Sequence, residues 1–310
     1  MTTLYVCDLD GTLLGTDAQP SRFTIDTVNS LVDDGVPISI ATARSLVSLR
    51  RVTGGLDLRG PAVVYGGAFV VDLASGETLV ERVLDPALVD RVLGVCARLG
   101  ISPLVYSVDA VSLDAVSVDP GSVDGVSVDR SRVALGGAST HADTVGWVAG
   151  SESPGIAWYL ADRGDDPRFR PVSSAAALRR DGTFSIVAIA PEAELRPAVD
   201  TLVRLFGDAV SVTLQEETYL PGVFWLELAA RGATKGTGIA ELKRLTGADR
   251  VVCFGDNRND LSMFEAADEA YAVDNASDEV KALATAVIGS NADDGVARWL
   301  AVNARVASAR

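Results

Sequence analysis

Short apolar runs alternate with helix-spaced apolar positions over the first 84 residues of the chain. Apolar runs at 4–7, 37–41 and 62–65 predict strands, and apolar positions at helical spacing around 25–32 and 46–52 predict helices between them. Strands that alternate with helices usually lie parallel, because each helix carries the chain back across the sheet. The pattern therefore predicts an open, mostly parallel, Rossmann-like α/β sheet.

The last third of the chain repeats this rhythm. Apolar runs at 250–254, 271–273 and 286–288 predict three short strands, and helix-spaced positions precede the first two of them. Strands of this kind extend the sheet that the first segment begins. Residues 1–84 and 229–310 are therefore expected to form one core domain.

The middle section has a different character. It begins with a helix over 88–99, whose predicted apolar face is Leu88, Val92, Val95 and Leu99. From 184 to 228 the pattern predicts a strand, a helix and two further strands. We therefore expect an inserted α+β domain over 85–228.

A repeat stands inside this insert. The triplet Ser-Val-Asp or Ser-Leu-Asp recurs every five residues from Ser107 to Asp129. Five is an odd number, so on a strand each repeat would face the opposite side, and no continuous apolar face results. A pentapeptide-repeat β-helix is the alternative, but a solenoid needs several stacked coils. We expect residues 107–129 to form a hairpin or loop of the insert.

Charge narrows the classes of partner. The formal net charge is −15, with 42 acidic against 27 basic residues, and we find no Lys/Arg cluster. A nucleic-acid or anionic-membrane partner would need a basic patch that overcomes this field, so neither is expected. No stretch of 18 apolar residues and no signal peptide is recognised, and the sequence is expected to be cytoplasmic.

Cysteine and histidine usage limits the chemistry further. The three cysteines are Cys7, Cys96 and Cys253, which make no disulfide framework. His141 is the only histidine in the sequence, so a Ser-His-Asp triad or a His-rich zinc site has little to draw on. Carboxylate, Lys, Thr and Ser side chains are left as the candidates for chemistry.

Two carboxylates, Asp8 and Asp10, follow the first predicted strand and precede Gly11. In extended chain, side chains two residues apart project to the same side, so both carboxylates are expected to converge on one cation or proton. A solvated Asp-Gly turn is the simpler alternative. A calcium loop of the EF-hand type fails on spacing, because its glycine would fall at position four and Gln19 would stand at position twelve.

Further polar motifs follow other predicted strands or open helices. They are Thr42 with Arg44, Lys235, and the run from Asp256 to Asp260. Each motif has an ordinary structural alternative. Thr42, Asp256 and Asp260 are good helix-capping residues, and a lysine in the first turn of a helix is usually at the surface. Ligands of open α/β sheets bind beyond the carboxyl ends of the strands, so these motifs are expected to meet Asp8 in one crevice.

Taken together, the motifs resemble the haloacid dehalogenase (HAD) superfamily of phosphohydrolases, in particular its Cof-type members (subfamily IIB), which carry a large α+β cap. The resemblance covers nearly the whole core and little of the insert. It rests on Asp8 to Leu14, Thr42 with Arg44, Lys235, Gly255-Asp256 with Asn259-Asp260, and the tail from Asn291 to Val296.

This resemblance implies catalytic and metal-binding roles. Asp8 would be the nucleophile and Asp10 the general acid/base. Asp8, the Asp10 carbonyl and Asp256 would bind Mg²⁺, supported by Asp260 and Asn259. Hard oxygen ligands of this kind suit Mg²⁺ better than zinc.

The resemblance also implies a phosphate site. Thr42 and Lys235 would hold the transferring phosphoryl group, and Gly11, Arg44 and Asn259 would line the same site. An anion that attacks a phosphate dianion needs positive charge between the two, which a lysine and a metal ion can supply.

The expected function is a Mg²⁺-dependent phosphatase that hydrolyses a small phosphorylated metabolite, with a sugar phosphate as the first candidate, through an aspartyl-phosphate. A phosphomutase of the same superfamily is one alternative, and a catalytically silent binding or regulatory protein of this fold is another. The chain has Tyr65-Gly66-Gly67-Ala68 where such proteins often have Tyr-Asn-Gly-Ala. That departure and the repeat leave the substrate open, and the sequence indicates no oligomeric state.

Overall fold

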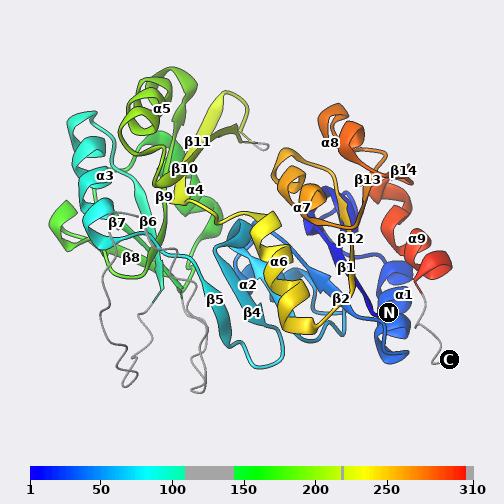
Figure 1. Cartoon of the computed structure of the whole chain (residues 1–310). Helices are drawn as coiled ribbons and strands as arrows, with labels where there is room; N and C mark the ends of the chain where they lie inside the picture. The colour runs from blue at the N-terminus through cyan, green and yellow to red at the C-terminus, as the bar shows by residue number, and fades with distance from the viewer. Residues whose placement is uncertain (109–142, 218–219, 305–310) are drawn as a thin grey trace, which may run out of the picture. The chain divides into compact units, whose positions relative to one another are not determined.

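The computed structural model describes residues 1–108, 143–217 and 220–304 (Figure 1). Two compact units divide them, one of residues 1–81 and 232–304 and one of residues 82–108, 143–217 and 220–231. Beyond Val108, the repeat that was predicted as a hairpin or loop over 107–129 lies outside the described residues. The boundaries at 84/85 and 228/229 stay a prediction.

The first unit is built on a five-stranded parallel sheet, which confirms the predicted fold class. Its strand order is β14-β13-β12-β1-β2, and every neighbouring pair is parallel. The strands are β1 (Thr3–Cys7), β2 (Ile38–Ile40), β12 (Arg250–Gly255), β13 (Glu269–Val273) and β14 (Ala286–Ile288). Because β1 and β12 are paired neighbours, their carboxyl ends bring Asp8 and Asp256 to the same edge.

Six helices of the described residues accompany this sheet: α1 (Arg22–Asp33), α2 (Leu46–Val52), α6 (Lys235–Thr246), α7 (Leu261–Ala266), α8 (Asp278–Leu283) and α9 (Gly295–Asn303). Helix α1 contacts α9, and α6 contacts α7 (Figure 1). Serine and threonine side chains open three of the helices, because their oxygens accept from otherwise unpaired first-turn amides: Ser21, Ser45 and Thr234.

The third predicted strand begins an antiparallel sheet of its own. Strand β3 (Pro61–Val64) pairs antiparallel with β4 (Phe69–Asp72), which pairs with β5 (Thr78–Glu81). One isolated parallel bridge, between Ala41 and Val63, links β3 to the region beyond β2. The third predicted strand is therefore present, and its contact with that region is parallel. The sequence analysis did not predict the hairpin that follows it, in which positive φ at Tyr65, Gly66 and Gly67 reverses the chain.

The second unit holds a six-stranded sheet in the order β10-β11-β9-β6-β7-β8. The predicted strand-helix-strand-strand unit is present as β9 (Thr183–Pro191), α5 (Glu192–Phe206), β10 (Val210–Glu216) and β11 (Val223–Ala230). The sequence analysis missed β6 (Leu104–Val108), β7 (Asp143–Val148), α4 (Pro154–Arg163) and β8 (Phe169–Val172).

The predicted helix of this unit is present as α3 (Pro86–Arg98), and Val92 and Val95 of its predicted apolar face are buried, but the buried face is wider than predicted. Val89 and Leu93 are buried, whereas Leu99 lies beyond the helix and is 41% exposed. Apolar residues on several sides of α3 made the face ambiguous. Among the described residues, no helix has the length and apolar character needed to cross a membrane.

Candidate active site

Asp8 is the first residue beyond β1, and the chain leaves the strand there. Residues Leu9–Leu13 form a tight helical turn, within which Asp10 and Gly11 have non-helical backbone angles. The turn separates the two carboxylates: Asp8 is buried, whereas the Asp10 side chain is 51% exposed. The expected convergence of Asp8 and Asp10 on one cation or proton stays a prediction, because Asp10 lies in the turn and its carboxylate contacts Arg44 in this structure.

Lys235 lies at the centre of the buried site. It opens α6 and is 1% exposed, so the reading of a first-turn surface lysine is wrong. Its Nζ donates to Asp8 Oδ1 at 2.6 Å and to Asp260 Oδ1 at 2.6 Å. The ammonium thus bridges carboxylates that are 227 and 25 residues away along the chain.

Asp260 is engaged through both of its oxygens. While Oδ1 accepts from Lys235, Oδ2 accepts from the backbone amides of Asp256 at 2.9 Å and Asn257 at 3.0 Å. Its carboxylate therefore shapes the loop after β12 and orients Lys235. Asn259, predicted to support the phosphate site, is exposed in the turn Arg258–Asp260.

Thr12 is a site residue that the sequence analysis did not single out. Its hydroxyl donates to Asp256 Oδ1 at 2.7 Å. The preceding Gly11 has φ +76°, and a Cβ there would lie 2.5 Å from Asp256 Oδ2. Asp256 therefore packs directly on the turn that follows Asp8. The adjacency of Thr12 to the Asp-x-Asp-Gly run was the signal that could have found it.

Burial and charge shift the pKa values of this cluster. Burial raises the pKa of Asp8 to about 8, although Lys235 opposes the shift, and burial raises the pKa of Asp256 to about 6. Burial alone would lower the pKa of Lys235, but the carboxylates of Asp8 and Asp260 raise it above its usual range. One ammonium among three carboxylates leaves an excess of negative charge, so the site favours a proton or a cation.

The donor set fits a hard divalent cation. Carboxylate oxygens of Asp8, Asp256 and Asp260 all lie within 4.8 Å of one another. Carboxylate and carbonyl oxygens are the ligands that Mg²⁺ prefers. The Asp10 carboxylate does not belong to this cluster of the described residues, and the metal ligand predicted at Asp10 is its carbonyl oxygen.

Arg44 holds the exposed Asp10. Its Nε donates to Asp10 Oδ2 at 2.7 Å and its Nη2 donates to Oδ1 at 2.6 Å, while Nη1 donates to Ser48 Oγ at 2.8 Å. A bidentate pair of this kind fixes the plane of the carboxylate. Arg44 therefore binds the predicted acid/base in this structure, whereas the sequence analysis placed it on the phosphate.

Thr42 is buried at the start of the loop that leads to Arg44. Its Oγ1 accepts from the Arg44 amide at 3.1 Å, and its carbonyl accepts from the Gly66 amide at 2.9 Å. Since the Thr42 oxygen is the acceptor in that contact, its own hydroxyl can donate to another anion. The loop is thereby fixed to the hairpin turn between β3 and β4.

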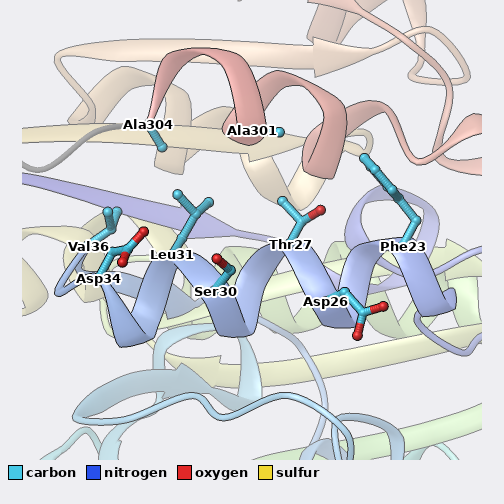
Figure 2. Close-up of a pocket in the computed structure, with 9 residues that line it drawn as sticks. All are labelled: Phe23, Asp26, Thr27, Ser30, Leu31, Asp34, Val36, Ala301 and Ala304. Atoms are coloured by element: carbon cyan, nitrogen blue, oxygen red, sulfur yellow. The ribbon is translucent and has the colours of Figure 1, made fainter.

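A separate surface cavity of about 810 Å³ lies along α1. Phe23, Thr27 and Leu31 project from α1 towards the segment that carries Ala301 and Ala304 (Figure 2). None of the predicted site residues is among the described residues that line it. The cavity is therefore distinct from the carboxylate cluster.

Three curated relatives match the chain over almost its full length. Pyridoxal phosphate phosphatase YbhA of Escherichia coli is 26% identical over 97% of this chain and 98% of its own length. HMP-PP phosphatase of Yersinia enterocolitica is 25% identical, covering 97% and 94%. The 5-amino-6-(5-phospho-D-ribitylamino)uracil phosphatase YitU of Bacillus subtilis is 26% identical, covering 96% of each.

Solved structures share the fold. TM0651 from Thermotoga maritima covers 99% of both chains with a TM-score of 0.75 and 22% identity. A haloacid dehalogenase-like hydrolase from Bacteroides thetaiotaomicron covers 97% of this chain and 98% of its own, with a TM-score of 0.72 and 21% identity. The family model of the haloacid dehalogenase-like hydrolases matches residues 5–129 and 169–300. The resemblance drawn from the motifs is confirmed, and the chain belongs to the haloacid dehalogenase-like hydrolase family, in which the relatives named here are phosphatases.

Proposed function

We propose that this protein is a Mg²⁺-dependent phosphatase that hydrolyses a small phosphorylated metabolite through a phosphoryl group carried on Asp8. The observation that carries the proposal is the buried Lys235, whose ammonium contacts Asp8 and Asp260 at 2.6 Å each. A buried cation beside a buried carboxylate is the arrangement that a phosphate dianion and an attacking anion require. The exposed Asp10, held by Arg44, stands two residues further on.

In the first step, an oxygen of Asp8 forms a bond to phosphorus and the bond from phosphorus to the ester oxygen breaks. The departing oxygen takes a proton from Asp10. In the second step, water attacks the aspartyl-phosphate, its proton passes to Asp10, and the Asp8 carboxylate is released with inorganic phosphate. Asp10 ends protonated and ready for the next cycle, and the two contacts from Arg44 fix the plane of its carboxylate.

Lys235 and Thr42 are proposed to hold the transferring phosphoryl group. Lys235 contributes its ammonium, and Thr42 contributes the hydroxyl proton that its contact with the Arg44 amide leaves for donation. Gly11 and Asn259 are proposed to border the same space. In this structure Arg44 contacts Asp10, so any role of Arg44 at the phosphate would require that ion pair to open.

Asp8, Asp256 and the carbonyl of Asp10 are proposed to hold Mg²⁺. When bound, the ion supplies positive charge that offsets repulsion between the carboxylate and the phosphate. Asp260 is assigned to the support of the site, because both of its oxygens already accept hydrogen bonds from Lys235 and from backbone amides.

The proposed substrates are small phosphorylated metabolites, with a sugar phosphate as the first candidate. The three curated relatives are named for pyridoxal phosphate, HMP-PP and 5-amino-6-(5-phospho-D-ribitylamino)uracil. Those names support hydrolysis over the phosphomutase and silent-protein alternatives, and they add three compounds to test. A cytoplasmic location is also proposed, supported by the free state of Cys7, Cys96 and Cys253.

The experiment is phosphate release from a panel of phosphorylated metabolites that includes sugar phosphates and the three compounds named above. It is run with Mg²⁺ and with a chelator, on the wild type, on Asp8→Asn and on Asp26→Asn, which changes an exposed aspartate of α1. We expect Mg²⁺-dependent release by the wild type and Asp26→Asn, and none by Asp8→Asn. Release that persists in Asp8→Asn would refute the proposed nucleophile.

A further inference from the structure

The turn that carries Asp10 and the residue that follows it, Leu14, are each held at a carbonyl oxygen by an asparagine from the far end of the chain. Asn275 Nδ2 donates to the Gly11 carbonyl at 2.7 Å, and Asn291 Nδ2 donates to the Leu14 carbonyl at 2.9 Å. These contacts span 264 and 277 residues of sequence. They fix the backbone on the C-terminal side of Asp10 without touching its side chain.

The two asparagines also contact each other. The Asn291 amide donates to Asn275 Oδ1 at 3.0 Å, and Ser290 Oγ donates to the same oxygen at 3.3 Å. Because Asn275 Oδ1 accepts from a backbone N–H, its Nδ2 has to face the Gly11 carbonyl. The orientation of the Asn275 amide is thus set by the turn that carries Asn291.

That turn is itself closely built. A Cβ on Gly295 would lie 1.8 Å from the Gly289 carbonyl oxygen, so the residue has to be glycine. Asp294 has φ +58°, and its Oδ1 accepts from the buried Thr24 hydroxyl at 3.0 Å. The tail motif singled out in the sequence, from Asn291 to Val296, is therefore explained as an anchor, a role that the proposed chemistry did not give it.

The loop of Asn275 also reaches the carboxylate cluster. The Ser277 amide donates to the Asp256 carbonyl at 3.1 Å, so one loop after β13 holds the backbones of both Gly11 and Asp256. Gly11 has no side chain and φ +76°, so other segments can hold it only through its backbone. Loss of these contacts would free the backbone that directs the Asp10 side chain.

We propose that Asn275 and Asn291 are positioning residues that act through Asp10, by fixing the turn from which its carboxylate projects. The proposal rests on the function proposed above, in which Asp10 transfers the proton. Misplacement of a catalytic group by about 1 Å can cost on the order of 10²-fold in rate. We expect Asn275→Ala and Asn291→Ala each to lower kcat/KM by about 10-fold to 10²-fold.

The test is a double-mutant cycle on phenyl phosphate, a poor leaving group, and p-nitrophenyl phosphate, a good one. Each alanine variant is made in the wild type and in Asp10→Asn. If the asparagines act through Asp10, each alanine substitution lowers kcat/KM most for phenyl phosphate when it is made in the wild type. The same substitution lowers kcat/KM little further when it is made in Asp10→Asn. An equal loss in both backgrounds, or no loss in the wild type, overturns the proposal.

Asn29→Ala is the matched control. Asn29 also bridges two segments, since its Nδ2 donates to the Gly55 carbonyl at 3.0 Å and its Oδ1 accepts from the Asp57 amide at 2.7 Å. The Asn29→Ala substitution removes the same kind of contact without changing any contact of the turn that carries Asp10. Its kcat/KM on both esters is expected to equal that of the wild type, and a matching loss in Asn29→Ala would reduce the effect to general loosening of the fold.

Hydrogen exchange supplies a readout that needs no turnover. The Leu14 amide donates to the Leu9 carbonyl at 2.9 Å, so it reports directly on the turn. Its exchange is expected to be faster in Asn275→Ala and Asn291→Ala than in the wild type or Asn29→Ala. If the wild type hydrolyses no ester, the proposed function fails, but hydrogen exchange still tests whether the asparagines hold the turn. If the exchange of the Leu14 amide is unchanged in both alanine variants, the proposal that they hold the turn is overturned.

Discussion

Gly67 lies so close to Thr234 that a Cβ on the glycine would be 2.0 Å from the Thr234 carbonyl oxygen. Thr234 is the N-cap of α6, and the next residue is Lys235. The same hairpin turn also bonds the loop of Thr42 and Arg44, through the amides of Gly66 and Tyr65. The turn after β3 therefore sets the separation between the Thr42 loop and the buried ammonium.

This contact predicts a large effect of Gly67→Ala. The helix start has to move away, which displaces Lys235 and costs about 1–3 kcal/mol of stability by overpacking. We expect kcat to fall by about 10²-fold. Gly66→Ala is the control, because Gly66 also has positive φ but nothing lies within 4 Å of its Cβ position. Denaturant unfolding and steady-state rates measure both, and equal rates for the two variants would contradict the account.

Removal of the buried ammonium is predicted to destabilise the fold. Lys235→Met leaves Asp8 and Asp260 buried without their shared cation, which we expect to cost about 3–5 kcal/mol near neutral pH. Lys243→Met is the comparison, because its pair with Asp268 is about two-fifths exposed on each side and should contribute about 0–1 kcal/mol. Urea unfolding measures both, and a similar small loss for the two variants would show that the buried bridge is unimportant to stability.

The metal-free protein is predicted to lose stability as the pH rises. Burial raises the folded-state pKa of Asp8 to about 8 and of Asp256 to about 6, above the unfolded value of about 3.9. The folded state then holds protons that the unfolded state releases, so this contribution is complete below about pH 4 and is lost as the pH rises through about 8. Asp8→Asn should flatten the dependence.

Thermal unfolding with a chelator and with Mg²⁺, between about pH 5 and about pH 8, measures this prediction. Mg²⁺ should raise Tm more at the higher pH, because carboxylate ligands have to lose their protons to bind it. A Mg²⁺ effect that is as large in Asp8→Asn and Asp256→Asn as in the wild type would place the ion elsewhere.

Arg44→Lys is predicted to slow turnover although it keeps the charge. Lysine cannot form the bidentate contact that Arg44 makes with Asp10, so the carboxylate loses its fixed plane. We expect kcat to fall about 10-fold, and more on poor leaving groups, while Arg22→Lys, at the exposed pair with Asp26, is neutral. Steady-state rates on aryl phosphates of graded leaving-group pKa decide the matter. A loss that is independent of the leaving group would argue against the link to Asp10.

The parallel core and the meeting of motifs at one edge could be predicted, because strand periodicity and strand-end polar residues are local signals. The Gly66-Gly67 pair between two apolar runs could have predicted the β3–β4 hairpin, but the alternation of strands and helices favoured a crossover helix instead. The burial of Lys235 could not be predicted from the neighbouring sequence. Its two partners are distant in sequence, and nothing near Lys235 marks it as different from a surface lysine.

The direction of Asp10 could not be predicted for a similar reason. Period-two alternation holds inside a strand, and the strand ends at Cys7. What aims Asp10 is the turn at Gly11, the contact with Arg44 and the grip of Asn275. Arg44 and Asn275 come from segments that are distant in the sequence, so no window of sequence around Asp10 contains those two contacts.

The central claim is that Asp8 carries the phosphoryl group. Its most direct test is acid quenching of the enzyme during turnover with Mg²⁺ and a hydrolysed ester, followed by mass spectrometry of the peptide that contains Asp8. The account predicts one added phosphoryl group on Asp8 in the wild type and none in Asp8→Asn. If Asp10→Asn slows hydrolysis of the aspartyl-phosphate more than its formation, a larger fraction of that variant should carry the group. Turnover of the ester with no phosphoryl group on that peptide, together with undiminished phosphate release by Asp8→Asn, would contradict it.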